Sequence, residues 1–190
     1  MSARRLWWAL FGVYALLNYS TLGLMPSVWN TVNRSLGGRG LLLQYTIYSL
    51  FGIGILFYVL FIKREESILK YLLLLFFAGI FFIMVEFEKN PGEKIHMAQY
   101  GLSGLILYNA LKVDLDRFKM KLYAIGSAIC LLTGAVDEII QWFLPNRVFT
   151  WHDVFINGAS GIIVLLAIRF NILSRLRPSP TAADEGEVSA

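Results

Sequence analysis

Residues 134–161 read GAVDEIIQWFLPNRVFTWHDVFINGASG, and this stretch decides the fold. It begins inside one apolar helix, passes through a turn at a proline, and ends inside the next apolar helix. Its polar side chains are Asp137, Glu138, Gln141, Arg147, His152, Asp153 and Asn157. Four more lie earlier in the chain: Glu93, Lys94, His96 and Tyr100. We expect all of them to form one polar cluster at a membrane surface.

The composition is that of an integral membrane protein. Of the 190 residues, 57% are hydrophobic and only 16% are charged, whereas a soluble domain carries about 25% charged residues. Cys130 is the single cysteine, so an internal disulfide is excluded, and its apolar surroundings predict a buried thiol. The Lys and Arg residues occupy connections and tails, which argues against a nucleic-acid-binding surface.

Six apolar segments approach the roughly 20 residues that a helix needs to cross a bilayer. They cover residues 6–24, 41–62, 68–87, 95–111, 122–143 and 154–170. A backbone in the bilayer must satisfy its own hydrogen bonds, and barrel-like alternation is missing, so helices are expected. We predict an all-α, polytopic bundle of about six transmembrane helices over residues 1–177, followed by a disordered cytoplasmic tail at 178–190. The connection at 26–40 is expected to be a flexible loop with one short helix.

The basic residues predict the orientation. With six spans, the N-terminus and the even-numbered connections share one side, which holds twelve of the 17 Lys and Arg residues. They are Arg4, Arg5, Lys63, Arg64, Lys70, Lys112, Arg117, Lys119, Lys121, Arg169, Arg175 and Arg177. The positive-inside rule then places both termini in the cytoplasm and the polar stretch on the outer side.

Helical spacing gathers the polar groups on three faces. The faces consist of Glu93, His96, Tyr100 and Ser103; of Asp137, Glu138 and Gln141; and of Asp153, Asn157 and Gly161. Gly134, one turn before Asp137, permits close approach of another helix, as does Gly161. Asp153 is expected to cap the helix that begins beside it.

Asp137 and Glu138 lie near the outer end of their helix and need partners. A charge at membrane depth costs about 2.5–3.5 kcal/mol on insertion scales. Arg147, Lys94 and His96 are the available cations. The simplest arrangement pairs Arg147 with one carboxylate and His96 with the other.

Three sequence blocks in this region resemble the VanZ-like family of small membrane proteins. They are Glu93-Lys94-x-His96-x3-Tyr100, Asp137-Glu138-x2-Gln141-x3-Pro145-x-Arg147 and Asp153-x3-Asn157-x3-Gly161. The blocks follow the family order within residues 93–165, although the turn reads PNR where Pro-Gly-Arg is usual. The family is named for a protein associated with low-level resistance to the glycopeptide teicoplanin. The resemblance implies a multi-pass protein of the bacterial cytoplasmic membrane that acts at the cell envelope.

Two functional classes remain open, binding and catalysis. In the binding class, the site holds an anionic envelope lipid or a lipid-linked precursor through Glu93, Lys94, Tyr100, Gln141, Arg147 and Asn157. In the catalytic class, a membrane-embedded hydrolase or transferase uses His96, Asp137, Glu138 and Asp153 as acid–base groups. Binding is favoured because no Ser or Cys nucleophile with a suitably spaced base is visible.

Two further interpretations concern metal binding and structure. A mixed nitrogen and oxygen site could be drawn from Glu93, His96, Asp137, Glu138, His152 and Asp153. The chain lacks a His-Glu-x-x-His signature, so we predict neither a metal nor another cofactor, and membrane lipids are the expected partners. The competing structural interpretation is an interhelical hydrogen-bond network that fastens the last three helices together.

Overall fold

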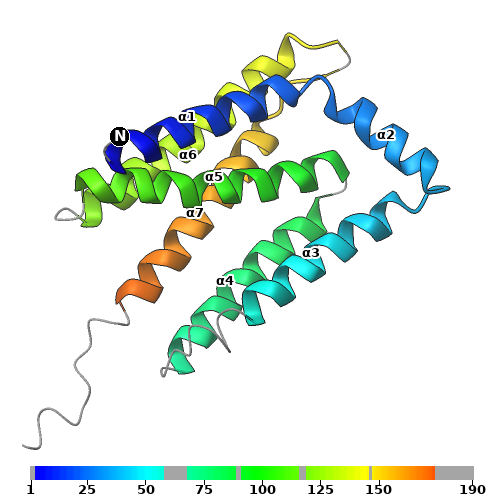
Figure 1. The fold of residues 1–190 in the computed structure, drawn as a ribbon. Helices are drawn as coiled ribbons and strands as arrows, with labels where there is room; N and C mark the ends of the chain where they lie inside the picture. Colours follow the sequence, from blue (N-terminus) through cyan, green and yellow to red (C-terminus); the bar gives the residue numbers. More distant parts are fainter. Residues whose placement is uncertain (1–2, 58–67, 89–90, 116–118, 146, 174–190) are drawn as a thin grey trace, which may run out of the picture.

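The computed structural model describes residues 3–57, 68–88, 91–115, 119–145 and 147–173, and these form seven α-helices (Figure 1). The helices are α1 Ala3–Thr21, α2 Met25–Ser35, α3 Gly40–Phe57, α4 Ile68–Phe87, α5 Pro91–Leu115, α6 Lys119–Trp142 and α7 Trp151–Leu173. No strand occurs in these ranges, so the all-α prediction is confirmed for the described residues. The tail predicted at 178–190 lies outside them.

The helix bounds follow the apolar segments with local adjustments. Helix α4 has the bounds of its apolar segment, Ile68–Phe87. Helix α5 begins at Pro91, because proline suits the first turn of a helix, where its missing N–H is not needed. The early start places Glu93 and Lys94 inside the helix, ahead of the predicted span at 95–111.

Helix α2 is the short helix expected between the first two apolar segments. It meets α1 at an angle of 68° and leads through a tight turn to α3. Gly37 and Gly38 have φ values of 59° and 85° in that turn. Glycine adopts this left-handed conformation without steric cost, which explains why the SLGGRG sequence reverses the chain here.

Three helices are long and apolar enough to cross a membrane within the described residues. They are Ile68–Phe87, Met120–Trp142 and Trp151–Phe170, and the bent pair α1–α2 adds a fourth if it counts as one span. The six predicted spans are therefore recovered only in part. His96, Gln99 and Asn109 interrupt α5, which makes this helix less apolar than its length alone would predict.

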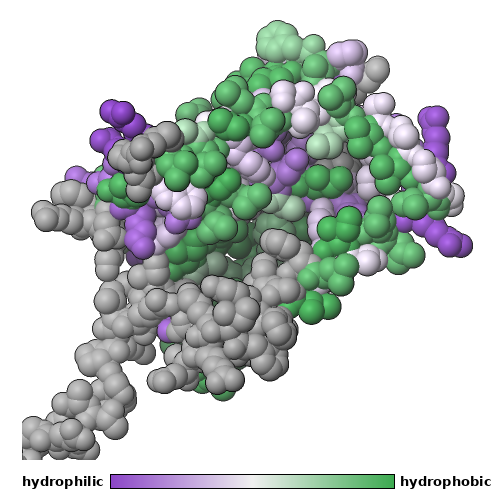
Figure 2. All heavy atoms as spheres, in the orientation of Figure 1, coloured by the Kyte–Doolittle hydropathy of each residue, from purple (hydrophilic) through white to green (hydrophobic). Residues whose placement is uncertain are grey.

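The surface fits an apolar surrounding. On α4, the large side chains of Phe76 and Phe82 are each 60% exposed, and an uninterrupted apolar surface of this kind is unusual on a water-soluble monomer. In Figure 2, hydrophilic residues gather at opposite ends of the molecule, near the start of α1 and near the α2–α3 turn, with hydrophobic residues between. The described chain is thus a helical bundle suited to a membrane.

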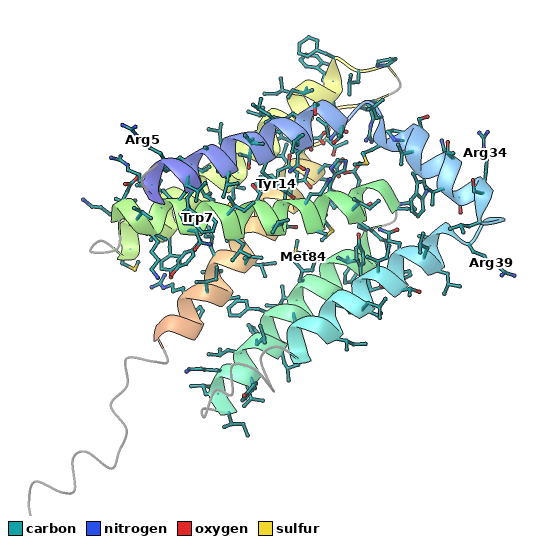
Figure 3. The ribbon with its side chains drawn as sticks, in the orientation of Figure 1. Arg5, Trp7, Tyr14, Arg34, Arg39 and Met84 are labelled. Carbon is teal, nitrogen blue, oxygen red and sulfur yellow. The ribbon has the colours of Figure 1, made fainter. Side chains whose placement is uncertain are left out.

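Helices α5 and α7 form the centre of the bundle. Helix α7 packs against α4, α5 and α6, while α1 packs against α5 and α6 (Figure 1). Helix α1 is held along α5 by the Tyr14 hydroxyl, which donates to the Gln99 carbonyl at 3.0 Å, and by Trp8 Nε1, which donates to Asp114 at 3.0 Å. Tyr14 lies between these two helices in Figure 3.

The α5–α6–α7 unit has an apolar half and a polar half. Its apolar core consists of Leu107, Tyr108, Leu111, Leu122, Tyr123, Cys130 and Leu165. These residues come from the end of α5, the first part of α6 and the later part of α7. The opposite ends of the same helices carry the buried polar residues, because α6 runs back along α5 and α7 runs back along α6.

Glycines allow the three helices to approach closely between the two halves. A Cβ atom on Gly104 would lie 2.7 Å from the Gly161 carbonyl oxygen, and one on Gly161 would lie 2.7 Å from Cys130 Sγ. A Cβ on Gly134 would lie 2.9 Å from the Val154 carbonyl oxygen. Close packing at Gly134 and Gly161 is therefore confirmed, as is the burial of Cys130, which is 4% exposed.

Candidate functional site

The candidate site lies where α5 begins, α6 ends and α7 begins. We call it the polar cluster, and it comprises Glu93, His96, Asp137, Glu138, Gln141, Arg147, Asp153 and Asn157. All of these side chains are buried except those of Arg147 and Asp153, which are partly exposed. Three helices and one loop supply the cluster, so residues more than 60 positions apart in the sequence meet there.

The carboxylates of Asp137 and Glu138 are the most enclosed of the polar cluster, and neither residue has exposed surface. Gln141 Nε2 donates to Asp137 Oδ2 at 3.1 Å and to Glu138 Oε1 at 3.0 Å. Asn157 Nδ2 donates to Asp137 Oδ2 at 3.2 Å and thereby joins α7 to α6. Amide N–H groups therefore bond to Asp137 Oδ2 and to Glu138 Oε1, where cations were expected.

Glu138 also organises the start of α7. Its Oε2 accepts a hydrogen bond from the Thr150 backbone N–H at 3.0 Å. The Thr150 hydroxyl in turn accepts the Asp153 N–H at 3.1 Å, so Thr150 caps α7 and the expected cap by Asp153 is wrong. A Ser/Thr-x-x-Asp/Glu pattern before an apolar run is a known capping signal, and Thr150-x-x-Asp153 could have been recognised from it.

Arg147 connects the α6–α7 loop to α5. Its Nη1 lies 3.2 Å from Glu93 Oε1, and the two side chains are 18% and 6% exposed. Arg147 also acts electrostatically on Asp137 and Glu138 without a direct ion pair to either among the described residues. The predicted pairing of Arg147 with Asp137 or Glu138 is therefore wrong for the described residues, because Arg147 pairs with Glu93 instead.

Glu93 lies just outside the apolar segment at 95–111 and has an unusual acidity. Burial and, after it, the Asp153 carboxylate raise the pKa of Glu93 from 4.5 to about 7, against the lowering effect of the Arg147 guanidinium. A carboxyl group with this pKa exchanges its proton near neutral pH, so the charge of the polar cluster depends on pH.

Four buried polar atoms of the cluster have no hydrogen-bond partner among the described residues. They are Glu93 Oε2, His96 Nε2, Asp137 Oδ1 and Arg147 Nε. The predicted pairing of His96 with a carboxylate is therefore wrong for this part of the chain. The charge of Arg147 acts on the other three residues, so the unused donors and acceptors belong to one neighbourhood. Buried polar groups in native proteins rarely lack partners, and such groups commonly mark functional sites.

Of two further predicted ligand-binding residues, Lys94 points away from the polar cluster, whereas Tyr100 lies beside Asp137. Lys94 Nζ donates to the Tyr45 hydroxyl of α3 at 2.8 Å and lies 5.2 Å from the centre of that ring. Lys94 is therefore not brought to the carboxylates. The Tyr100 hydroxyl donates to the Thr133 carbonyl at 3.5 Å, which places Tyr100 at the edge of the polar cluster.

Helix α3 supports the start of α5, a role that the sequence did not reveal. Gln44 Nε2 donates to the Pro91 carbonyl at 3.2 Å, and the Tyr48 hydroxyl donates to the Lys94 carbonyl at 2.9 Å. Both bonds stabilise the first turn of the helix that carries Glu93 and His96. No spacing rule connects residues that lie 46 or 47 positions apart in the chain.

A second group of possible metal ligands lies beside the polar cluster. Glu88, His152 and Asp153 offer one ligand atom each, and all three atoms lie within 4.8 Å of one another. His152 and Asp153 belong to the mixed metal site considered from the sequence. Glu88 was missed because it directly follows an apolar helix and matches no ligand-spacing rule.

Compared with models of known protein families, with curated proteins and with solved structures, the chain matches none of them.

Proposed function

We propose that this chain is a VanZ-like integral membrane protein that binds an anionic envelope lipid at an outward-facing site and thereby affects susceptibility to teicoplanin. In this proposal it crosses the bacterial cytoplasmic membrane six times, with both termini in the cytoplasm. The three sequence blocks that resemble the family support it, since α5, α6 and α7 bring their residues into one polar cluster.

The unused donors of Arg147 carry the binding proposal. A guanidinium has five N–H donors, and a single one of them bonds to another described residue, through Nη1 to Glu93. Nε is buried without a partner among the described residues, and the side chain retains 18% exposure. Arginine binds phosphate and carboxylate groups through paired, charge-assisted hydrogen bonds. An anionic lipid headgroup is the ligand that best matches these donors beside an apolar surface.

The charge distribution supports the proposed orientation. Arg5 lies at one end of the bundle, and Arg34 and Arg39 lie at the other (Figure 3). Arg34 and Arg39 belong to the side of the membrane that carries fewer basic residues, which the positive-inside rule assigns to the outside. Counting α3 and α5 as spans gives the six crossings. At about 1.5 Å per residue, residues 95–115 of α5 are long enough to reach across a hydrocarbon core of about 30 Å, and Glu93 precedes them.

A second candidate function is hydrolysis or transfer on the same lipid. His96 favours it, because His96 is 3% exposed and its Nε2 has no partner in the described part of the chain. An imidazole held near Arg147 could act as a general base toward a bound phosphate ester. Asp137, Glu138 and Asp153 would be the further acid–base groups of such an enzyme.

The binding proposal is tested with two lipids that differ only in the presence of the phosphate group. The full chain is placed in phosphatidylcholine nanodiscs, and binding of a long-chain polyprenyl phosphate is compared with that of the corresponding neutral polyprenol. We expect saturable binding of the phosphate. Arg147→Ala should weaken it by about 10–100-fold, because hydrogen bonds to charged groups contribute about 1.5–3 kcal/mol and 1.4 kcal/mol is a factor of ten.

Two further variants separate binding from folding. Arg39→Ala removes an exposed arginine far from the polar cluster and should bind like the parent. Arg147→Lys keeps the charge that faces Glu93 but loses the planar fork, so it should bind with intermediate affinity. Equal affinity in the parent and Arg147→Ala, or equal binding of phosphate and alcohol, would refute the binding proposal. Release of inorganic phosphate by the parent, abolished in His96→Ala, would favour the enzyme.

The cellular consequence is tested in a glycopeptide-sensitive host. Parent, Arg147→Ala and Arg39→Ala are expressed at matched membrane abundance, and teicoplanin susceptibility is measured. We expect protection by the parent and by Arg39→Ala alone. Protection that persists in Arg147→Ala would contradict a role of the headgroup site in susceptibility.

A further inference from the structure

The end of α4 and the start of α7 present a compact set of potential ligands. Glu88 follows the last residue of α4, and His152 and Asp153 lie in the first turn of α7. Helices α4 and α7 pack against each other and run in opposite directions, since Phe77 and Phe170 stack with ring centres 5.7 Å apart toward the other end. Helix packing therefore places these three side chains together.

The spacing of the ligand atoms suits a transition-metal ion. His152 Nε2 and Glu88 Oε2 are 3.4 Å apart. Zinc bonds to nitrogen and oxygen measure about 2.0–2.2 Å, so two ligands at tetrahedral angles lie about 3.3–3.6 Å apart. The first two atoms already have this separation. The Asp153 oxygen lies within 4.8 Å of both, so a side-chain rotation that moves it by about 1 Å would complete a three-ligand set.

The local charge also favours a cation. The Asp153 carboxylate repels the carboxylates of both Glu93 and Glu138. Glu93 is 4% exposed and its Oε2 has no partner among the described residues. Several carboxylates thus lie around Asp153, and among the described residues Arg147 is already paired with Glu93. A divalent ion at Asp153 would relieve this repulsion.

We propose that Glu88, His152 and Asp153 form a binding site for a divalent metal ion of the zinc type. An imidazole nitrogen with two carboxylates suits zinc or manganese, whereas calcium and magnesium prefer oxygen ligands alone. Three protein ligands leave at least one coordination position for water or for an oxygen of a bound molecule. The ion would also join the end of α4 to the start of α7. This site goes beyond the proposed lipid binding and does not depend on it.

The test uses zinc alone and the two histidines of the chain. The full chain is purified without a polyhistidine tag, stripped with a chelator, and titrated with Zn²⁺ by calorimetry in detergent. We expect about one zinc ion per chain. His152→Ala and Glu88→Gln should each lower the affinity by at least about 100-fold, since loss of even an outer-shell partner of a metal ligand costs about 10–100-fold.

The matched control is His96→Ala, which removes the other, buried histidine and should bind zinc like the parent. The side chain of His152 is 68% exposed, so His152→Ala should fold normally and melt like the parent when zinc is removed. Added zinc should raise the Tm of the parent but not that of His152→Ala. The proposal is overturned if the parent binds zinc no more tightly than His152→Ala. It is also overturned if affinity is lost in His96→Ala instead.

Discussion

Substitution of Gly104 by alanine tests the helix crossing on which the polar cluster depends. The new Cβ would lie 2.7 Å from the Gly161 carbonyl oxygen and 2.9 Å from Gly161 Cα, while ordinary contacts begin at 3.4 Å. Both neighbours are backbone atoms, so no side chain can rotate away. Helices α5 and α7 must therefore separate by roughly 0.7 Å, and overpacking of this kind costs about 1–3 kcal/mol.

A matched substitution isolates the packing effect. A Cβ on Gly79 of α4 meets no atom within 4 Å. Gly79→Ala therefore gains only the helix preference of alanine, about 0.5–1 kcal/mol, which Gly104→Ala gains as well. The difference between the two variants is the cost of the crossing alone, about 1–3 kcal/mol. For a chain of this size it corresponds to a Tm difference of roughly 2–12 °C.

Thermal unfolding followed by tryptophan fluorescence in detergent measures this difference. We expect Gly79→Ala to melt at or slightly above the temperature of the parent, and Gly104→Ala to melt below both. Zinc affinity should change little in Gly104→Ala, because Glu88 and His152 join α4 to α7. If Gly104→Ala melts together with Gly79→Ala, the reasoning that α5 and α7 touch at Gly104 and Gly161 is wrong.

Two further predictions concern pH and orientation. Glu93 has a pKa of about 7 in the folded protein and an ordinary value of 4.5, set by burial, Asp153 and Glu138 against Arg147. The folded protein therefore keeps a proton that the unfolded chain has lost, so stability falls as the pH rises from about 4.5 to about 7. The difference in the free energy of unfolding between about pH 5 and about pH 8 should be smaller in Glu93→Gln than in the parent, and an unchanged difference would contradict the assignment. Val148 is 78% exposed beside Arg147, and Cys130 is 4% exposed. An impermeant maleimide should label Val148→Cys but not the parent in intact cells, and labelling only after the cells are broken would refute an outward site.

The helices were predictable because the length of each apolar segment and the residues that end it are local features of the sequence. Residues 68–87 were predicted as one apolar segment, and α4 has the same bounds. The number of membrane crossings was less predictable, because α3 and α5 are not among the candidate spans found in the described residues. In α5, polar side chains such as His96 and Gln99 face other helices, and hydropathy does not record which side of a helix is enclosed.

The membership of the polar cluster was largely predictable, whereas its pairings were not. Helical spacing correctly placed Asp137 with Gln141, since residues four apart share a face. The hydrogen-bond partners that come from different helices could not be predicted in this way. Arg147 bonds to Glu93, and Lys94 turns to Tyr45. These two pairings depend on how the α6–α7 loop folds back toward α5 and on how α3 meets α5.

The sequence by itself determined an all-helical chain with long apolar helices, the close approach at Gly134 and Gly161, and the concentration of polar groups near the start of α7. Each of these rests on composition or on spacing within one helix. The tertiary structure alone decided that the amides of Gln141 and Asn157 bond to Asp137 Oδ2, that Thr150 caps α7, and that Glu88 lies beside His152 and Asp153. The physical reason is that such contacts depend on the helix crossings, and the crossings depend on which backbones can approach within van der Waals distance.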